Sequence, residues 1–210
     1  DRIYLRAVEP EDMDVMYEME NDPSMWDISN FTVPYSRYVL RQYIEGSQCD
    51  VFADKQLRLM IMSKSDHRIL GTIDITDFVP LHSRGEVGIA VHKDYRRQGY
   101  ASDALQLLCE YAFDFLSLTQ LYAHVATDNE VCMKLFTSCG FVQCGLLKDW
   151  LQVGGCYKDA AIFQYLNPAM LILYFAVIYR VAPKAKEIIA VLCSVSGIFL
   201  VATHGNIHAM

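Results

Sequence analysis

The stretch Arg96-Arg97-Gln98-Gly99-Tyr100-Ala101 decides how the chain is interpreted, because it joins an expected strand at residues 86–92 to an amphipathic helix. Glycine has no Cβ, so the backbone at Gly99 can approach a ligand closely. The free N–H groups at the start of the next helix form a site for an anion, and the two arginines add positive charge. The stretch therefore predicts a pyrophosphate site; the alternative is a tight turn with two solvated arginines.

The segments around this turn predict a mixed α/β (α+β) domain built on one sheet. Apolar residues recur with a 3.6-residue period from Ala101 to Leu116, which indicates a helix with one buried face. Turn residues and apolar runs divide the rest of the first 167 residues into short elements. Further helices are expected at residues 9–20, 36–45 and 129–139, and strands at residues 3–8, 57–63, 69–76, 86–92, 121–126, 141–148 and 157–166.

The net charge and the cysteine content of the chain argue against several classes of protein function. The 210 residues are 53% hydrophobic and carry a net charge of −7. Residues 168–210 hold three basic residues and one acid, so residues 1–167 carry a net charge of −9. This surplus of acids argues against a nucleic-acid partner and suits either a cationic substrate or simple solubility. The seven cysteines form no CxxC pair and the histidines no cluster, so we expect neither a disulfide framework nor a metal site, and a cytoplasmic location.

Three motifs resemble one family when taken in order along the chain. Arg96-x-x-Gly99-x-Ala101 resembles the acetyl-CoA motif of the GNAT superfamily of N-acetyltransferases. Asn129 with the segment 135–141 (LFTSCGF) resembles the family's "N...LYxxxGF" segment. The segment 154–159 (GGCYKD) resembles a late turn of the spermidine acetyltransferase and ribosomal-protein acetyltransferase branches. The resemblance implies the GNAT fold, a mixed and mostly antiparallel sheet flanked by helices, over residues 1–167.

The resemblance also implies acetyl-CoA as the cosubstrate, with no metal. Backbone groups of Ile89, Ala90 and Val91 are expected to pair with its pantetheine arm along a sheet edge. Asn129 is expected to help hold the cosubstrate where two parallel strands separate. The amides expected to cradle the pyrophosphate belong to Arg96, Arg97, Gln98, Gly99, Tyr100, Ala101 and Ser102.

Two positions are implied for catalysis. Glu86 matches a position that often serves as the base, taking a proton from the attacking amine directly or through water; the alternative is a strand residue without a task. Phe136 stands where relatives often carry a tyrosine that protonates the leaving thiolate, and it cannot donate a proton. Either the thiolate leaves more slowly, with Phe136 packed beside the sulfur end of the cosubstrate, or the domain is an acyl-CoA-binding regulatory domain with little turnover.

The acceptor is expected to be a primary amine, with a polyamine-like small amine favoured. The paired glutamates of the spermidine branch are replaced here by Thr32 and Val33, which weakens that assignment. A peptide N-terminus, as in the ribosomal-protein branch, is the alternative. A homo-oligomer is also expected. The residues expected to bind the acceptor are Trp26, Asp27, Tyr35 and Asp74.

Residues 168–210 form a separate, apolar segment that is expected to be helical. Two apolar runs, residues 169–179 and 188–203, flank the basic turn 180–186, and each is short for a membrane span. The segment resembles a fragment of an EamA-like drug/metabolite transporter. It is interpreted as a truncated fusion, an artefact or a helical hairpin, and it would attach the enzyme to a membrane if it is native.

Overall fold

A computed structural model describes residues 2–22, 34–47, 50–153 and 155–167. Trp26, Asp27 and the tail at residues 168–210 lie outside the described residues, so the calls on them stay predictions. A compact unit ends at Tyr165, and the domain boundary expected near residue 167 also stays a prediction. Within the described ranges, no helix is long and apolar enough to cross a membrane.

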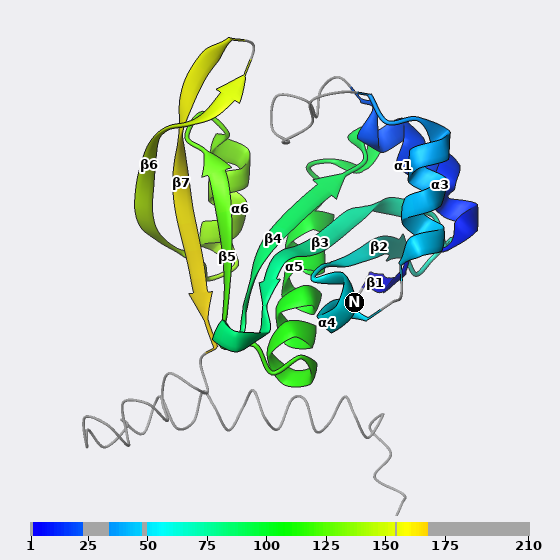
Figure 1. Cartoon of the computed structure of the whole chain (residues 1–210), viewed down its shortest axis with the longest axis horizontal. Helices are drawn as coiled ribbons and strands as arrows, with labels where there is room; N and C mark the ends of the chain where they lie inside the picture. Colours follow the sequence, from blue (N-terminus) through cyan, green and yellow to red (C-terminus); the bar gives the residue numbers. More distant parts are fainter. Residues whose placement is uncertain (1, 23–33, 48–49, 154, 168–210) are drawn as a thin grey trace, which may run out of the picture. The chain divides into compact units, whose positions relative to one another are not determined.

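One seven-stranded sheet, in the order β1-β2-β3-β4-β5-β7-β6, forms the centre of the domain (Figure 1). The pairs β1–β2, β2–β3, β3–β4 and β6–β7 are antiparallel, whereas β4–β5 is parallel. This arrangement confirms the predicted mixed α/β fold. The strands are β1 (Ile3–Ala7), β2 (Leu57–Ser63), β3 (Ile69–Val79), β4 (Arg84–Val91), β5 (Gln120–Ala126), β6 (Val142–Val153) and β7 (Cys156–Leu166).

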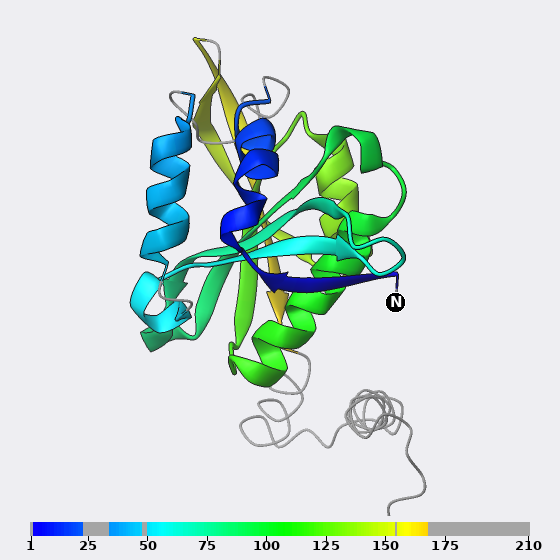
Figure 2. The ribbon, with the colours of Figure 1, turned by 90° about the vertical axis from the view of Figure 1, so that its right-hand side faces the viewer.

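Helices cover both faces of the sheet (Figure 2). Helices α5 (Tyr100–Glu110) and α6 (Glu130–Ser138) lie on one face, and their apolar sides form the main core with residues such as Ile73, Leu105 and Phe163. Helices α1 (Met13–Glu20) and α3 (Arg37–Gly46) lie on the other face. They bury a smaller, methionine-rich core made of Met16, Leu40, Met60 and Met62.

Local capping chemistry explains where these helices begin. The Ser36 hydroxyl accepts a hydrogen bond from the Val39 amide at the start of α3. Asn129 does the same for the Cys132 amide at the start of α6. Shorter helical turns are η1 (Pro10–Asp12), α4 (Val51–Asp54), η2 (Pro80–His82) and η3 (Lys93–Tyr95).

Four segments differ from the sequence prediction: helix α4 is not among the expected helices, β3 runs to Val79 instead of residue 76, and the ends of α5 and β6 also differ. The helix expected to continue to Leu116 changes at Tyr111 into a π-helical turn, η4 (Tyr111–Phe115), which the Leu116 amide closes on the Tyr111 carbonyl. The wider turn allows the rings of Tyr111 and Phe115 to stack with centroids 5.1 Å apart. Strand β6 runs five residues beyond the predicted end, to Val153, and contains a register shift between Leu147 and Leu151.

The feature that matters most for function is the early end of the β4–β5 pairing. The two strands pair only from Arg84 opposite Gln120 to Glu86 opposite Tyr122, and they diverge toward the upper end of the sheet (Figure 1). Strand β4 remains paired with β3 as far as Val91. One edge of β4 beyond Glu86 therefore has no pairing with β5.

We expect Gly71→Ala to destabilise the protein, because Gly71 holds β3 against this part of β4. A Cβ at this position would lie 2.2 Å from the Ala90 carbonyl oxygen and 2.9 Å from the Val91 Cα, so backbone must move. The cost should be about 1–3 kcal/mol of unfolding free energy, measured by urea denaturation. Gly46→Ala at the end of α3 is the control, because a Cβ there meets nothing within 4 Å. Equal stability of the two variants would contradict this account.

Candidate active site

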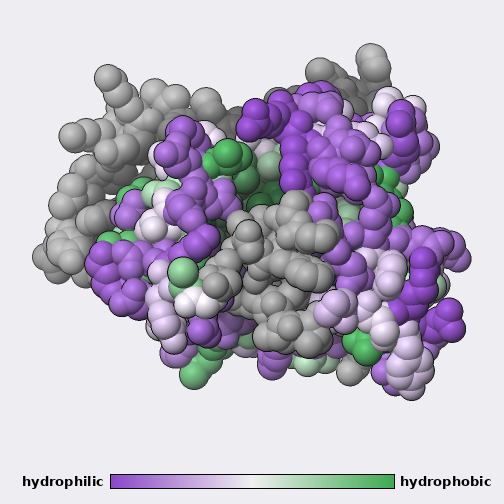
Figure 3. Space-filling view, turned by 90° about the horizontal axis from the view of Figure 1, so that it is seen from above, coloured by the Kyte–Doolittle hydropathy of each residue, from purple (hydrophilic) through white to green (hydrophobic). Residues whose placement is uncertain are grey.

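A groove of about 600 Å³ lies between the free edge of β4, the start of α5 and helix α6. We call it the β4 groove. In the view from above, hydrophobic surface lies in a hollow between hydrophilic side chains (Figure 3). The groove brings together most of the residues expected to bind acetyl-CoA. Those that line it are Ile89, Ala90, Val91, Arg96, Arg97, Gly99, Tyr100, Ala101, Ser102 and Asn129.

The turn between β4 and α5 lines the mouth of the groove. Arg97 and Gly99 both have left-handed backbone conformations, with φ of 62° and 84°. Gly99 directly precedes α5 and has no side chain to cap it. The N–H groups of the first helical turn, beginning with Tyr100, lack partners within the helix and carry its partial positive charge. The turn is thus open to the groove rather than occluded, as an anion site requires.

Arg2, which sequence analysis overlooked, holds this turn from the opposite end of the chain. Its Nη1 donates to the Gln98 carbonyl at 3.1 Å, and its Nη2 donates to Asp103 Oδ2 at 2.8 Å. Its guanidinium also lies 4.9 Å from the centre of the Tyr100 ring. Gln98, expected to contact the cosubstrate, is not among the groove-lining residues, and its carbonyl faces Arg2 instead. Arg2 therefore connects β1 to both sides of the turn.

Basic side chains line one part of the remaining groove, and apolar side chains line the other. Arg96 is anchored by its Nε, which donates to the Val91 carbonyl at 3.0 Å. Lys134 on α6 also lines the groove and forms an ion pair with Glu130 at 3.2 Å. Leu135 and Cys132 supply apolar wall, and burial raises the pKa of the Cys132 thiol to about 11, so this thiol stays protonated at neutral pH. Such a lining suits a ligand with phosphates at one end and an apolar arm.

Asn129 and Phe136, both on or beside α6, occupy different places. Asn129 lines the groove, but its Oδ1 already accepts the Cys132 amide at 3.1 Å, which leaves its Nδ2 for a ligand. Phe136 is only 2% exposed and does not line the groove. Its ring packs against Phe141 and Phe163, with centroids 5.0 Å and 6.0 Å away. Phe136 therefore belongs to the core, and the expected contact with the sulfur end of acetyl-CoA stays a prediction.

Glu86 forms a hydrogen-bonded pair with His124, a residue that sequence analysis did not single out. Glu86 Oε1 lies 2.7 Å from His124 Nδ1, and the two side chains are 30% and 25% exposed. Glu86 is the last β4 residue paired with β5, and His124 lies two residues beyond its partner Tyr122. The pair therefore stands where the two parallel strands begin to separate.

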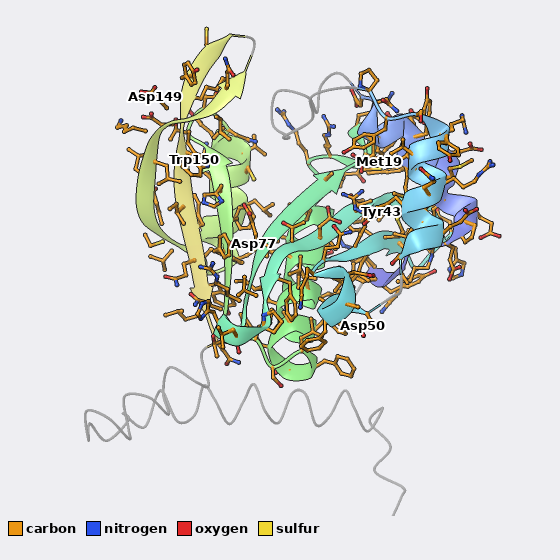
Figure 4. The ribbon with its side chains drawn as sticks, viewed as in Figure 1. Met19, Tyr43, Asp50, Asp77, Asp149 and Trp150 are labelled. Atoms are coloured by element: carbon orange, nitrogen blue, oxygen red, sulfur yellow. The ribbon has the colours of Figure 1, made fainter. Side chains whose placement is uncertain are left out.

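Aromatic rings surround His124. Trp150 stacks on the imidazole with centroids 6.1 Å apart, and Tyr122 meets it edge-on at 5.6 Å. Trp150 lies on the β6 side of the sheet in Figure 4. The backbone turns at Asp149, which has a φ of 51°, and the Asp149 amide donates to Asp159 Oδ1 at 3.0 Å. The aspartate of the segment 154–159 thus stabilises the irregular backbone that presents Trp150 to His124.

Of the residues expected to bind the acceptor, the structure describes Tyr35 and Asp74, and both lie on the α1–α3 face of the sheet. Asp74 accepts two hydrogen bonds from Arg58, at 2.8 and 3.0 Å, and Glu20 pairs with the same guanidinium. Burial alone would lower the pKa of Arg58, but the two carboxylates raise it above its ordinary value. We call Arg58, Glu20 and Asp74 the Arg58 cluster; the Tyr43 ring lies 5.5 Å from the guanidinium (Figure 4).

Tyr35 and the Arg58 cluster thus make contacts within the protein. The cluster, with two carboxylates and one guanidinium, keeps a surplus of one negative charge. Tyr35 packs against the methionine-rich core, and Asn21 hydrogen-bonds both its backbone N–H and its carbonyl. Gly88 pairs with Asp74, and a Cβ at Gly88 would lie 3.7 Å from Asp74 Oδ2. Asp74 therefore borders the bare backbone of β4 near Glu86. The part of the chain that the structure describes contains no group of three metal-ligating side chains.

Comparisons with known proteins agree on one family. The sequence model for the acetyltransferase (GNAT) domain matches residues 2–142. The chain is 28% identical over 167 residues to the uncharacterized N-acetyltransferase p20 of Bacillus licheniformis, covering 80% of this chain and 94% of that protein. It is 23% identical over 158 residues to the spermidine N(1)-acetyltransferase of Vibrio cholerae, covering 75% and 89%. The structure of the Vibrio cholerae spermidine N-acetyltransferase in complex with CoA and spermine superposes on this chain with a TM-score of 0.72. The two are 23% identical, and the match covers 81% of this chain and 98% of that one. This similarity shows a common fold.

Gly99→Val should weaken acetyl-CoA binding at least about tenfold, or ~1.4 kcal/mol, as measured by calorimetry. The new side chain would enter a groove-lining position and meet Arg2 Nη2, 3.0 Å from the added Cβ. Gly155→Val is the matched control, because Gly155 has a φ of 83° but a Cβ there meets nothing within 4 Å. The two variants carry the same backbone strain. An unchanged affinity in Gly99→Val would refute the phosphate-site assignment.

Arg2→Met should weaken acetyl-CoA binding about two- to fivefold, because it frees the turn while leaving every groove-lining side chain intact. Its partner carboxylate and Arg2 itself are both solvent-accessible, which keeps the effect small. Arg37→Met is the control: Arg37 also pairs with an aspartate and covers a tyrosine ring, but away from the groove. If both variants bind acetyl-CoA like the wild type, Arg2 does not order the turn.

Proposed function

Because the chain belongs to the acetyltransferase (GNAT) domain family and so transfers an acetyl group from acetyl-CoA to an amine, we propose that its acceptor is a small, polyamine-like primary amine. The amine attacks the thioester directly, without a covalent acetyl-enzyme. The single observation that carries this proposal is the free edge of β4, which leads from the amides at Gly99 to the Glu86–His124 pair.

The residues present fit the parts of acetyl-CoA. The amides of Gly99 and the first turn of α5, with Arg96 and Arg97, hold the diphosphate. Backbone groups from Ile89 to Val91 offer an unpaired strand edge, which suits the amides of the pantetheine arm as an added strand would. This edge ends at Glu86, so an arm that follows it brings its far end to the carboxylate.

Charge favours an acceptor with more than one ammonium group. The Arg58 cluster has two carboxylates for one guanidinium, and it lies on the same sheet face as Glu86. Burial raises the pKa of Glu20, although Arg58 opposes that shift. Residues 1–167 carry a net charge of −9, which attracts cations to this surface. A second ammonium group near Asp74 would place the reacting amine toward β4.

The Glu86–His124 pair supplies the base function in this proposal. The acceptor reacts as the neutral amine, after its ammonium form has lost a proton to solvent, and the pair takes the proton that the nitrogen releases on attack. Phe136 supplies no proton to the thiolate, because it is buried and has no ionisable group. The proton that the sulfur needs must therefore come from another side chain or from water.

The alternatives have less support. A regulatory domain that only binds acyl-CoA has no use for the Glu86–His124 pair where the β4–β5 pairing ends. A peptide N-terminus as acceptor has less support, because the spermidine N(1)-acetyltransferase matches 158 residues of this chain, whereas a putative ribosomal N-acetyltransferase of Bacillus subtilis matches 102. The homo-oligomer is proposed on the family resemblance alone.

Acetyl transfer to a panel of amines tests the proposal. The full chain, acetyl-CoA and spermidine, spermine, single amino acids or N-terminal peptides are mixed, and CoA release is measured with a thiol reagent. We expect the highest kcat/KM for spermidine or spermine, with a marked decrease at high salt because the attraction is electrostatic. Asp74→Asn should raise KM more than it lowers kcat. Turnover on peptides alone would overturn the acceptor class, and CoA release on no amine would overturn the function.

A further inference from the structure

We propose that His124 is the catalytic base of this reaction, and that Glu86 is the residue that positions it. This inference rests on the proposed function and assigns the proton transfer to one atom, His124 Nε2. The Glu86 carboxylate is the position that the sequence indicates as the base, whereas the geometry points to its neighbour.

The hydrogen bond fixes the form of the imidazole. A carboxylate can only accept hydrogen bonds, so the 2.7 Å contact between Glu86 Oε1 and His124 Nδ1 requires the proton on Nδ1. In the neutral ring, the remaining nitrogen, Nε2, then has a free lone pair. This is the arrangement of a histidine base oriented by a carboxylate.

The strand register places the ring at the reaction centre. Glu86 is opposite Tyr122, and His124 follows Tyr122 by two residues, so all three side chains lie on one face of the sheet. Pairing between the strands ends at Glu86, so His124 stands on β5 beyond the last paired residues. Its hydrogen bond reaches back across the gap to β4. The thioester end of a pantetheine arm that follows the β4 edge therefore meets the His124 ring first, and the Glu86 carboxylate lies behind that ring.

The surroundings of His124 leave the ring accessible and fixed. Trp150 covers one face of the imidazole and Tyr122 contacts its edge. A hollow of about 370 Å³ also borders His124, so the ring is reachable from the face that carries the Arg58 cluster. Among the described residues, the ionisable groups that line the same hollow are Arg84, Cys144 and Tyr122, and Asp77 accepts a hydrogen bond from Tyr122.

His124 can serve both halves of the reaction, which accounts for Phe136. When the neutral amine forms its bond to the thioester carbon, the nitrogen carries one proton too many, and Nε2 takes it. When the carbon–sulfur bond breaks, the electron pair leaves on sulfur, and the imidazolium returns that proton to the thiolate. Atoms and charge balance as amide plus free thiol. No tyrosine is then needed at position 136.

The decisive variant is His124→Asn. The asparagine Nδ2 can stand where Nδ1 stands and keep the hydrogen bond to Glu86, but the side chain has no counterpart of Nε2. If His124 is the base, kcat with acetyl-CoA and the best amine falls at least about 100-fold. If His124 only holds Glu86, the variant stays within about threefold of the wild type, which would overturn the inference. Glu86→Gln should lower kcat less, by about 10- to 100-fold.

Two further measurements separate a chemical role from a structural one. Added imidazole should restore part of the activity of His124→Ala and none of that of Glu86→Gln. In the full chain without acetyl-CoA, nitrogen NMR should show the His124 proton on Nδ1, and that preference should disappear in Glu86→Gln. A proton on Nε2 in the wild type would contradict the assignment.

Controls make the outcomes distinct. His82→Gln changes an exposed histidine on η2, away from the groove, and should leave kcat unchanged. Unaltered acetyl-CoA affinity in His124→Asn shows that the variant is folded. A wild-type protein that acetylates no amine overturns the proposed function. If the wild-type protein acetylates an amine and His124→Asn does so equally well, only the role of His124 is overturned.

Discussion

The loss of pairing between β4 and β5 beyond Glu86 and Tyr122 is the constraint on which the rest of this structure depends. A buried backbone N–H or C=O without a partner is costly, so a strand edge inside a domain must be covered or used. Here β3 keeps the other edge of β4 paired as far as Val91. The free edge of β4 is consequently held in place, and its regularly spaced N–H and C=O groups are available to a ligand that has amides of its own.

The anion site is held by interactions from outside it. Arg97 and Gly99 have left-handed backbone conformations in the turn that lines the groove, and arginine is not a residue that adopts this conformation readily. Arg2 compensates by binding both the Gln98 carbonyl and Asp103, across 96 and 101 residues of sequence. Arg2, which directly precedes β1, thus holds the strained turn, while Ser102 and its neighbours line the β4 groove.

Local chemistry explains which parts of this site the sequence could reveal. Strand and helix periodicity, caps and the Gly99 turn act over a few residues, so the sheet, the flanking helices and the turn between β4 and α5 could be predicted. Arg2, Trp150 and His124 act through partners far away in sequence; His124 and Glu86 are 38 residues apart. Alternation along 121–126 does mark Tyr122 and His124 as one face of a strand. Nothing local tells which strand lies opposite, and nothing in the motif at residues 135–141 indicates that Phe136 is buried in the core.

The sheet itself separates two opposite charges. On the α5–α6 side, helix-start amides and arginines favour the phosphates of acetyl-CoA. On the α1–α3 side, the Arg58 cluster has two carboxylates for one guanidinium and therefore a net negative charge. Arg58 shares this face of the sheet with Met60 and Met62, which lie beneath those helices. In the proposed reaction, a cationic acceptor and an anionic donor are therefore attracted to different faces, and the gap between β4 and β5 connects the two. His124 stands at that gap, with Nδ1 bound to Glu86 and Nε2 free, so the proton transfer occurs where the two charge fields adjoin.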